Sequence, residues 1–125
     1  MVLSREEVEK LLAPLESMLD KAFDDGDYEK VSTGYSEDAA FVHLGNSVVR
    51  GRKAIAQAFS KFNGLDATTM TNEKTHAFDI NDGEYLMRKG RYRFADGPWM
   101  RYMQLFHRQA DGSYLIVHDE FELKQ

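Results

Sequence analysis

The hydrophobic pattern of the chain changes period near its middle, and this change limits the folds that the sequence can adopt. In the N-terminal part, apolar residues recur at steps of three and four, the spacing of an amphipathic helix. The second half contains four strand-length segments, at 66–80, 84–94, 99–109 and 113–123. Turn sequences with Gly, Asn, Asp or Pro separate these segments. Helices followed by an antiparallel meander predict an α+β domain with helices on one face of a curved sheet.

The first helix is the most clearly marked element. Ser4 and Glu7 have the spacing of a capping box, and the apolar stripe after them predicts a helix over about residues 4–24. Pro14 lies inside this segment, so we expect a kink there or a regular helix that begins there. Gly26 suits the C-terminal end of the helix.

A short hairpin and two further helices are expected before the four strands. Asp27 is placed to cap a second helix, DYEKVSTGY. The segments AAFVHL and VVRG predict two short strands joined by a Gly-Asn turn. A third helix extends from Gly51 to Asn63-Gly64, with Ile55 and Phe59 on its apolar side.

Composition excludes several classes of function. The chain has 125 residues, the size of one domain, and we expect one domain over 1–125. Its net charge of −5 argues against nucleic acid and anionic membranes as partners. It has no cysteine for disulfides or thiolate chemistry, no apolar signal core and no run long enough to span a membrane. These features favour a cytoplasmic location.

The histidines give no sign of a metal site. His43, His76, His107 and His118 have no ligand spacing, so we expect neither a metal nor another cofactor. His43 follows Phe41 at a two-residue interval and is expected to face inward. There it is either a hydrogen-bonded structural histidine or a proton shuttle.

Two strands each place one charge on an otherwise apolar face. In 113–123, Asp119 alternates onto the face of Leu115, Val117 and Phe121. In 84–94, Arg88 alternates onto the face of Leu86, Gly90, Tyr92 and Phe94. Because an unpaired buried charge is costly, each needs a partner or a wet cavity.

Turn lengths predict how these strands pair. A two-residue loop at Asp111-Gly112 pairs Gln104 with Asp119 and Phe106 with Val117. A three-residue loop at 96–98 pairs Gly90 with Gln104, and the glycine leaves space. Arg88, Gln104 and Asp119 would then converge beside Tyr92 and Tyr102 and line a pocket.

Three interpretations of this convergence stay open. Arg88 and Asp119 form a structural ion pair bridged by Gln104. Alternatively, Asp119 is a general base whose pKa is raised by burial. In the third interpretation, Arg88 binds a ligand carboxylate. The last two compete, since a nearby guanidinium lowers the pKa of the base.

The chain resembles the nuclear transport factor 2-like superfamily, and above all its SnoaL-like families. The resemblance covers nearly the whole chain and rests on AFDDGDYEKVSTGYSEDAAFV, VVRGRKAIAQAF, GRYRF and LFHRQADGSYLIVHDEF, in that order. The last motif has Tyr114 where such families usually have Trp. The resemblance implies a cone of three N-terminal helices on a bent, mainly antiparallel sheet, with a pocket at the open end.

The resemblance also implies candidate functions and sites. The superfamily includes cofactor-free isomerases, dehydratases and cyclases, in which Asp119 with His43 or Tyr35 would be an acid–base pair. It also includes domains that only bind a ligand, and we expect a small molecule that is apolar or carries a carboxylate. The expected ligand-binding residues are Arg88, Gln104, Tyr92, Tyr102, Tyr35, Phe59 and Ile55.

A second similarity is to the association (hub) domain of calcium/calmodulin-dependent protein kinase II, through FVHLGNSVVRG and LFHRQADGSYLIVH. It implies an oligomerisation module in which Arg88 matches one arginine of the hub pocket, whereas Gln104 and Phe121 replace others. The strand pattern also predicts a homodimer through the outer sheet face, where Tyr114, Ile116 and Trp99 are expected.

Overall fold

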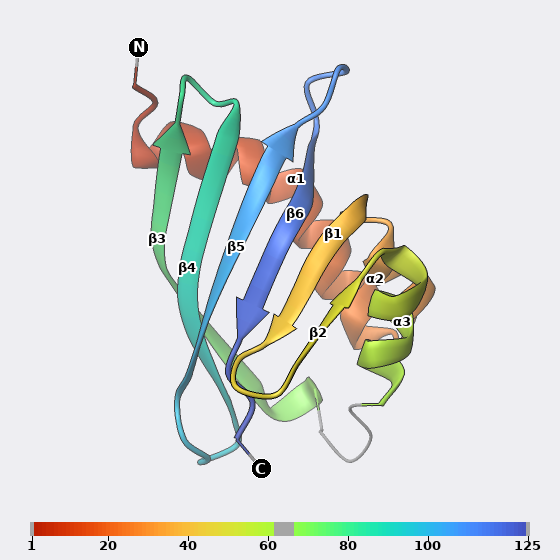
Figure 1. The fold of residues 1–125 in the computed structure, drawn as a ribbon. Helices are drawn as coiled ribbons and strands as arrows, with labels where there is room; N and C mark the ends of the chain where they lie inside the picture. The colour runs from red at the N-terminus through yellow and green to blue at the C-terminus, as the bar shows by residue number, and fades with distance from the viewer. Residues whose placement is uncertain (1, 62–66, 125) are drawn as a thin grey trace.

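The computed structural model describes residues 2–61 and 67–124 and has helices on one face of a six-stranded sheet (Figure 1). The helices are α1 (Arg5–Asp24), α2 (Tyr28–Ser32) and α3 (Arg52–Ser60), with a short 3-10 turn, η1 (Ala67–Thr69). The strands are β1 (Tyr35–His43), β2 (Ser47–Arg50), β3 (Met70–Ile80), β4 (Tyr85–Phe94), β5 (Met100–Arg108) and β6 (Tyr114–Phe121). Their order is β2-β1-β6-β5-β4-β3, and only the β1–β6 pair is parallel. The predicted α+β class is confirmed.

The capping signals in the sequence are confirmed. Ser4 Oγ accepts a hydrogen bond from the Glu7 amide at 3.2 Å, and the Glu7 carboxylate accepts one from the Ser4 amide at 3.1 Å. Asp27 caps α2, which is shorter than predicted because the chain is already extended at Tyr35. The predicted end of the third helix at Asn63-Gly64 and the start of the 66–80 strand lie outside the described residues.

A β-bulge in β6 overturns the predicted alternation of that strand. Leu105 pairs with His118 but Phe106 pairs with Ile116, so Val117 is an extra residue and the predicted Phe106–Val117 pair is wrong. Tyr114 and Ile116 are therefore buried in the core instead of lying on the outer face. After the bulge the inward positions become Asp119 and Phe121.

Two more strands carry the same irregularity. In β3 the register shifts between Lys74 and His76, and in β1 it shifts between Tyr35 and Ala40. Each bulge bends its strand and increases the local twist. The sheet therefore curves around α1, which crosses its inner face in Figure 1.

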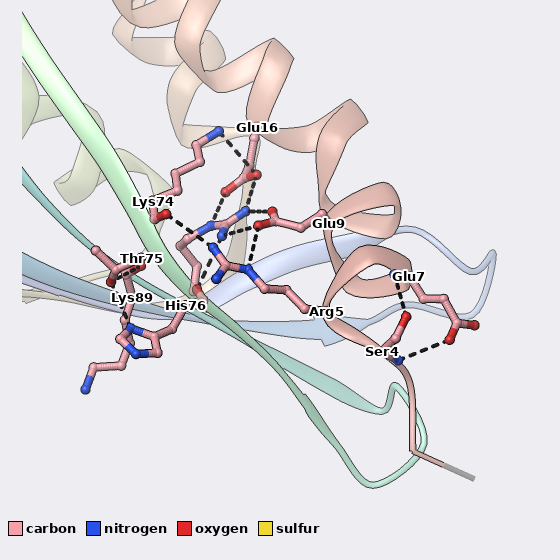
Figure 2. Close-up of polar contacts among 10 residues, drawn as sticks. Ser4, Arg5, Glu7, Glu9, Glu16, Lys74, Thr75, His76 and Lys89 are labelled. Atoms are coloured by element: carbon pink, nitrogen blue, oxygen red, sulfur yellow. Dashed lines mark hydrogen bonds and ion pairs between the residues drawn. The ribbon is translucent and has the colours of Figure 1, made fainter.

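A buried ion cluster fastens α1 to β4 (Figure 2). The Arg88 side chain is 0% exposed, and its Nε and Nη2 donate to the two carboxylate oxygens of Glu16, both at 2.9 Å. Nη1 donates to Glu9 at 3.1 Å and to the carbonyl of His76 at 3.3 Å. Burial alone would lower the pKa of Arg88, but its bonds to Glu9 and Glu16 outweigh this and raise it.

This cluster contradicts one of the three interpretations of the sequence, the ion pair between Arg88 and Asp119. The strand pattern indicates only partners on neighbouring strands, whereas α1 lies over β4 and supplies both carboxylates. Asp119 receives its hydrogen bonds from other residues, described below.

Loss of the Arg88 guanidinium is expected to destabilise the fold. Arg88→Met leaves the Glu16 carboxylate, 10% exposed, with only the Lys74 ammonium at 3.4 Å, so the free energy of unfolding should fall by about 3–5 kcal/mol. Arg91→Met, on the same strand, is the matched control. Arg91 and its partner Glu73 are both 46% exposed, and such a pair contributes about 1 kcal/mol or less. Equal losses in denaturant unfolding would contradict the structural role of Arg88.

Candidate functional site: an aromatic cavity beneath the first helix

A cavity of about 860 Å³ opens between the helices and the inner face of the sheet. Nine of the twenty described residues that line it are aromatic. The lining rings are Phe23, Tyr28, Tyr35, Phe41, Phe59, Tyr92, Phe94, Tyr102 and Phe121. A concave, largely apolar cavity of this size is typical of small-molecule sites.

The rings on one side of the cavity form a connected cluster around Phe59. Its ring centroid lies 5.0 Å from that of Phe41 and 6.1 Å from that of Tyr28, which it stacks against. Phe41 in turn packs against Phe121 at 4.8 Å. These contacts join α3, α2, β1 and β6, so the wall is fixed by several elements at once.

Gly90 and Tyr102 shape the opposite wall, and their pairing corrects the predicted register. Gly90 faces Tyr102, and Arg88 faces Gln104, because the connection between β4 and β5 is longer than a three-residue loop. A side chain at position 90 would meet the Tyr102 hydroxyl at 2.6 Å. Tyr102 therefore lies across the glycine and donates to Asn72 Oδ1 at 2.8 Å. The space expected at Gly90 is filled by this ring.

Asp119 is the deeply buried carboxyl of the cavity. Only 5% of the residue is exposed, and Oδ2 accepts from the Tyr35 hydroxyl at 2.6 Å and from Gln104 Nε2 at 3.3 Å. The predicted pairing of Gln104 with Asp119 across the strands is confirmed. Within the described residues, no donor bonds the second oxygen, Oδ1.

The protonation state of this pair follows from burial. Burial raises the pKa of Asp119 to about 6, against the lowering effect of the bonds from Tyr35 and Gln104. Burial and the neighbouring Asp119 charge raise the pKa of Tyr35 well above its ordinary value. Near neutral pH, Tyr35 is therefore a hydroxyl donor and Asp119 a carboxylate that accepts a proton readily.

The remaining charged residues of the lining lie on α1 and β3. Asp20 and Asp24 are one helical turn apart on α1, and Lys74 on β3 holds its ammonium 3.4 Å from Glu16. Burial raises the pKa of Asp20, and Lys74 opposes this rise. From the sequence, the apolar stripe of α1 is expected to pack in the core. Nevertheless Leu19 and Phe23 on that stripe line the cavity beside these carboxylates.

The structure brings together six of the predicted site residues and separates three. Around the cavity lie Asp119, Gln104, Tyr92, Tyr102, Tyr35 and Phe59. Arg88 lies in the ion cluster, and Ile55 is 0% exposed within the core. His43 stacks on Phe121 at 5.3 Å, with Nε2 3.3 Å from the Leu123 carbonyl, and does not line the cavity.

Asp119 is expected to make stability depend on pH. Its pKa is about 6 in the fold against an ordinary 3.8, so the folded state holds the proton more tightly. The resulting stabilisation is present below about pH 4 and is lost as pH rises through about 6, a change of roughly 3 kcal/mol. As pH rises over that range, the free energy of unfolding of Asp119→Asn should increase relative to that of the parent. Denaturant unfolding at several pH values checks this, with the exposed Glu6→Gln as control, and a constant difference between Asp119→Asn and the parent would contradict it.

The fold has many structural neighbours of low sequence identity. A protein assigned as a calcium/calmodulin-dependent protein kinase type II association domain from Thiobacillus denitrificans superposes with a TM-score of 0.72 at 17% identity, covering 89% of this chain and 93% of that one. A ketosteroid isomerase-like protein from Erwinia carotovora atroseptica gives 0.72 at 16% identity, covering 95% and 97%. A nuclear transport factor 2-like protein with a cystatin-like fold from Novosphingobium aromaticivorans gives 0.70 at 21%, covering 94% and 82%.

Sequence comparison is consistent with these neighbours. No curated protein sequence matches the chain significantly. At the identities above, the structural likeness shows a shared fold and no more. The model of the SnoaL-like domain family, however, matches residues 15–118, which include Asp20, Asp24 and β6 as far as His118, one residue before Asp119. The chain therefore belongs to the SnoaL-like domain family.

Proposed function

We propose that the chain binds a small, ring-containing apolar molecule in the cavity. The observation that carries this proposal is the aromatic wall, in which nine rings surround one buried carboxyl within about 860 Å³. Flat apolar rings pack well against such walls, and burial of their surface supplies the affinity. The likeness to a ketosteroid isomerase-like protein supports a ring-shaped ligand.

Several polar groups of the cavity wall already have hydrogen-bond partners within the protein, and this limits the polar contacts that a ligand can make. The Tyr92 hydroxyl donates to the carbonyl of Glu122, and the Tyr102 hydroxyl donates to Asn72. Arg88 was the reason to expect a carboxylate on the ligand, and its guanidinium is bonded to Glu9 and Glu16. Asp119 Oδ1 has no donor among the described residues, so the bound molecule should present a hydrogen-bond donor to it.

Filling the cavity should abolish binding. In Met70→Trp a large ring enters the cavity from β3, whereas the adjacent Thr71 is exposed and does not line the cavity, so Thr71→Trp is the matched control. We expect the Kd for β-naphthol, measured by fluorescence titration, to rise at least about tenfold in Met70→Trp and to stay unchanged in Thr71→Trp. The same Kd in both variants would place binding elsewhere.

A second candidate function is proton transfer to and from carbon. The observation that favours it is Asp119, whose raised pKa of about 6 and unbonded Oδ1 suit a general base. Tyr35 and Gln104, which hold Oδ2, would keep the carboxyl oriented.

This candidate predicts deuterium exchange at the carbon beside a ketone. β-Tetralone in heavy water should exchange its α-protons faster with the protein than with buffer, as followed by proton NMR. The rate should rise as pH passes about 6, because the base must be ionised, and Asp119→Asn should abolish it. Exchange that survives in Asp119→Asn would assign the protein as a binder without this chemistry.

We also infer that the chain self-associates through its outer sheet face. Phe78, Met87 and Leu105 lie in one row across β3, β4 and β5, and Phe78 is exposed. Trp99 lies beside the outward-facing Arg91 and Arg93. Its ring centroid is 4.1 Å from the guanidinium carbon of Arg91 and 4.5 Å from that of Arg93. The likeness to a kinase association domain supports assembly of copies.

Sedimentation velocity at micromolar concentration tests this inference. The parent should sediment as a species heavier than the 14.4 kDa chain. Leu105→Lys should dissociate it, because a charge would be buried in the interface. Leu11→Lys introduces the same charge at an exposed position of α1 and should leave the assembly intact. A parent that sediments as a monomer would overturn the inference.

A further inference from the structure

The charges that line the cavity are unbalanced. Three carboxylates, Asp20, Asp24 and Asp119, face one cation, Lys74, among the lining residues that the structure describes. Lys74 already lies 3.4 Å from Glu16, whose two oxygens also receive Arg88. The excess negative charge therefore borders the cavity, and the cations of the ion cluster do not neutralise it.

We propose that the cavity takes a cationic amine, with the ammonium group bound to Asp119 and the apolar part held by the surrounding rings. This inference rests on the proposed function, since it names the chemical class of the molecule that the cavity binds. An ammonium group supplies the donors that Asp119 Oδ1 lacks.

The rings around Asp119 suit a cation as well as an apolar surface. Phe41 lies directly opposite Asp119 in the β1–β6 pair, and Tyr35 bonds to its carboxylate. Phe41 and Tyr35 pack edge to face, with centroids 6.1 Å apart, and Phe121 packs against Phe41. An aromatic face attracts an ammonium group within about 6 Å, and this attraction strengthens when water is excluded.

Other classes of ligand fit this site less well. A carboxylate would approach Asp119 without any free cationic donor and would meet repulsion from Asp20 and Asp24. A neutral molecule would leave the Asp119 charge in the cavity without a counterion, although burial already raises the pKa of this carboxyl. An ammonium ion supplies the counterion and removes the penalty.

The other titratable groups of the cavity do not compete for this role. Tyr92 and Tyr102 have pKa values raised by burial, the latter to about 12, so both are neutral hydroxyls. His118 and Glu120 flank Asp119 in sequence but bond to each other at 3.0 Å and do not line the cavity. Asp20, Asp24 and Lys74 lie across the cavity on α1 and β3, where the two carboxylates favour the entry of cations.

Three probes with the same ring system and substitution point test the charge preference: naphthylmethylamine, naphthalenemethanol and naphthoate. Titration calorimetry near pH 7 should show the amine binding about ten- to a hundredfold more tightly than the alcohol, the range expected for a charged hydrogen bond, with naphthoate weakest. Asp119→Asn should remove the advantage of the amine and change the affinity for the alcohol by less than about threefold.

The pH dependence separates this contact from general attraction to an acidic protein. Affinity for the amine should rise as pH increases through about 6, because Asp119 becomes ionised while an alkylamine stays charged. It should be flat in Asp119→Asn and unchanged from the parent in Glu6→Gln, which removes an exposed carboxylate from the first turn of α1, outside the cavity lining.

The outcomes distinguish this inference from the proposed function. If the alcohol binds, loses affinity in Met70→Trp and matches the amine, the cavity is a small-molecule site without a preference for cations, and the inference fails. Tightest binding of naphthoate would overturn it in the same way. If none of the three probes binds, both the inference and the proposed function fail.

Discussion

The packing of the first helix on the sheet depends on the bond between Arg88 and two carboxylates of α1. Arg88 is fully buried and satisfies both oxygens of Glu16 in a bidentate arrangement, with Glu9 on its other side. Such a pair is costly to assemble in the interior and still more costly to break, so it defines where the helix lies on β4. The next turns of α1 then extend over the sheet, where Asp20 and Phe23 become one wall of the cavity.

Curvature supplies the other wall. Bulges in β1, β3 and β6 bend the sheet away from a flat surface, so the inward side chains surround a volume that α1 covers without filling. The β6 bulge has a chemical consequence as well. By shifting the alternation after Val117, it keeps Ile116 in the core and turns Asp119 toward Tyr35. The buried carboxyl and its tyrosine are thus products of the same irregularity that shapes the sheet.

The cavity and the ion cluster divide the charges of the interior into two groups. Arg88 behind the cavity and Lys74 in its wall are paired with Glu9 and Glu16. Inside the cavity, Asp119 accepts hydrogen bonds from a hydroxyl and an amide, and no lysine or arginine of the described residues bonds to it. A carboxylate in this environment is destabilised by burial, which makes it both a better base and a stronger attractor of a cationic ligand. The two properties have one physical origin, the burial of the Asp119 carboxyl.

The sequence by itself determined the elements, the α+β class and the family resemblance, because helical and strand periods and capping signals are local. It also identified Gln104 opposite Asp119, although the turn it assumed was one residue too short. Arg108 pairs with Tyr114 beside the turn, and the extra residue at Val117 restores the predicted register further along the strand. Only the tertiary structure decided which charge meets which. Arg88 bonds to Glu16, which lies 72 positions away in the chain, and no local sequence pattern predicts that contact. The bulge at Val117 was equally hidden, because an extra residue changes no hydrophobic count and appears only when two strands are paired.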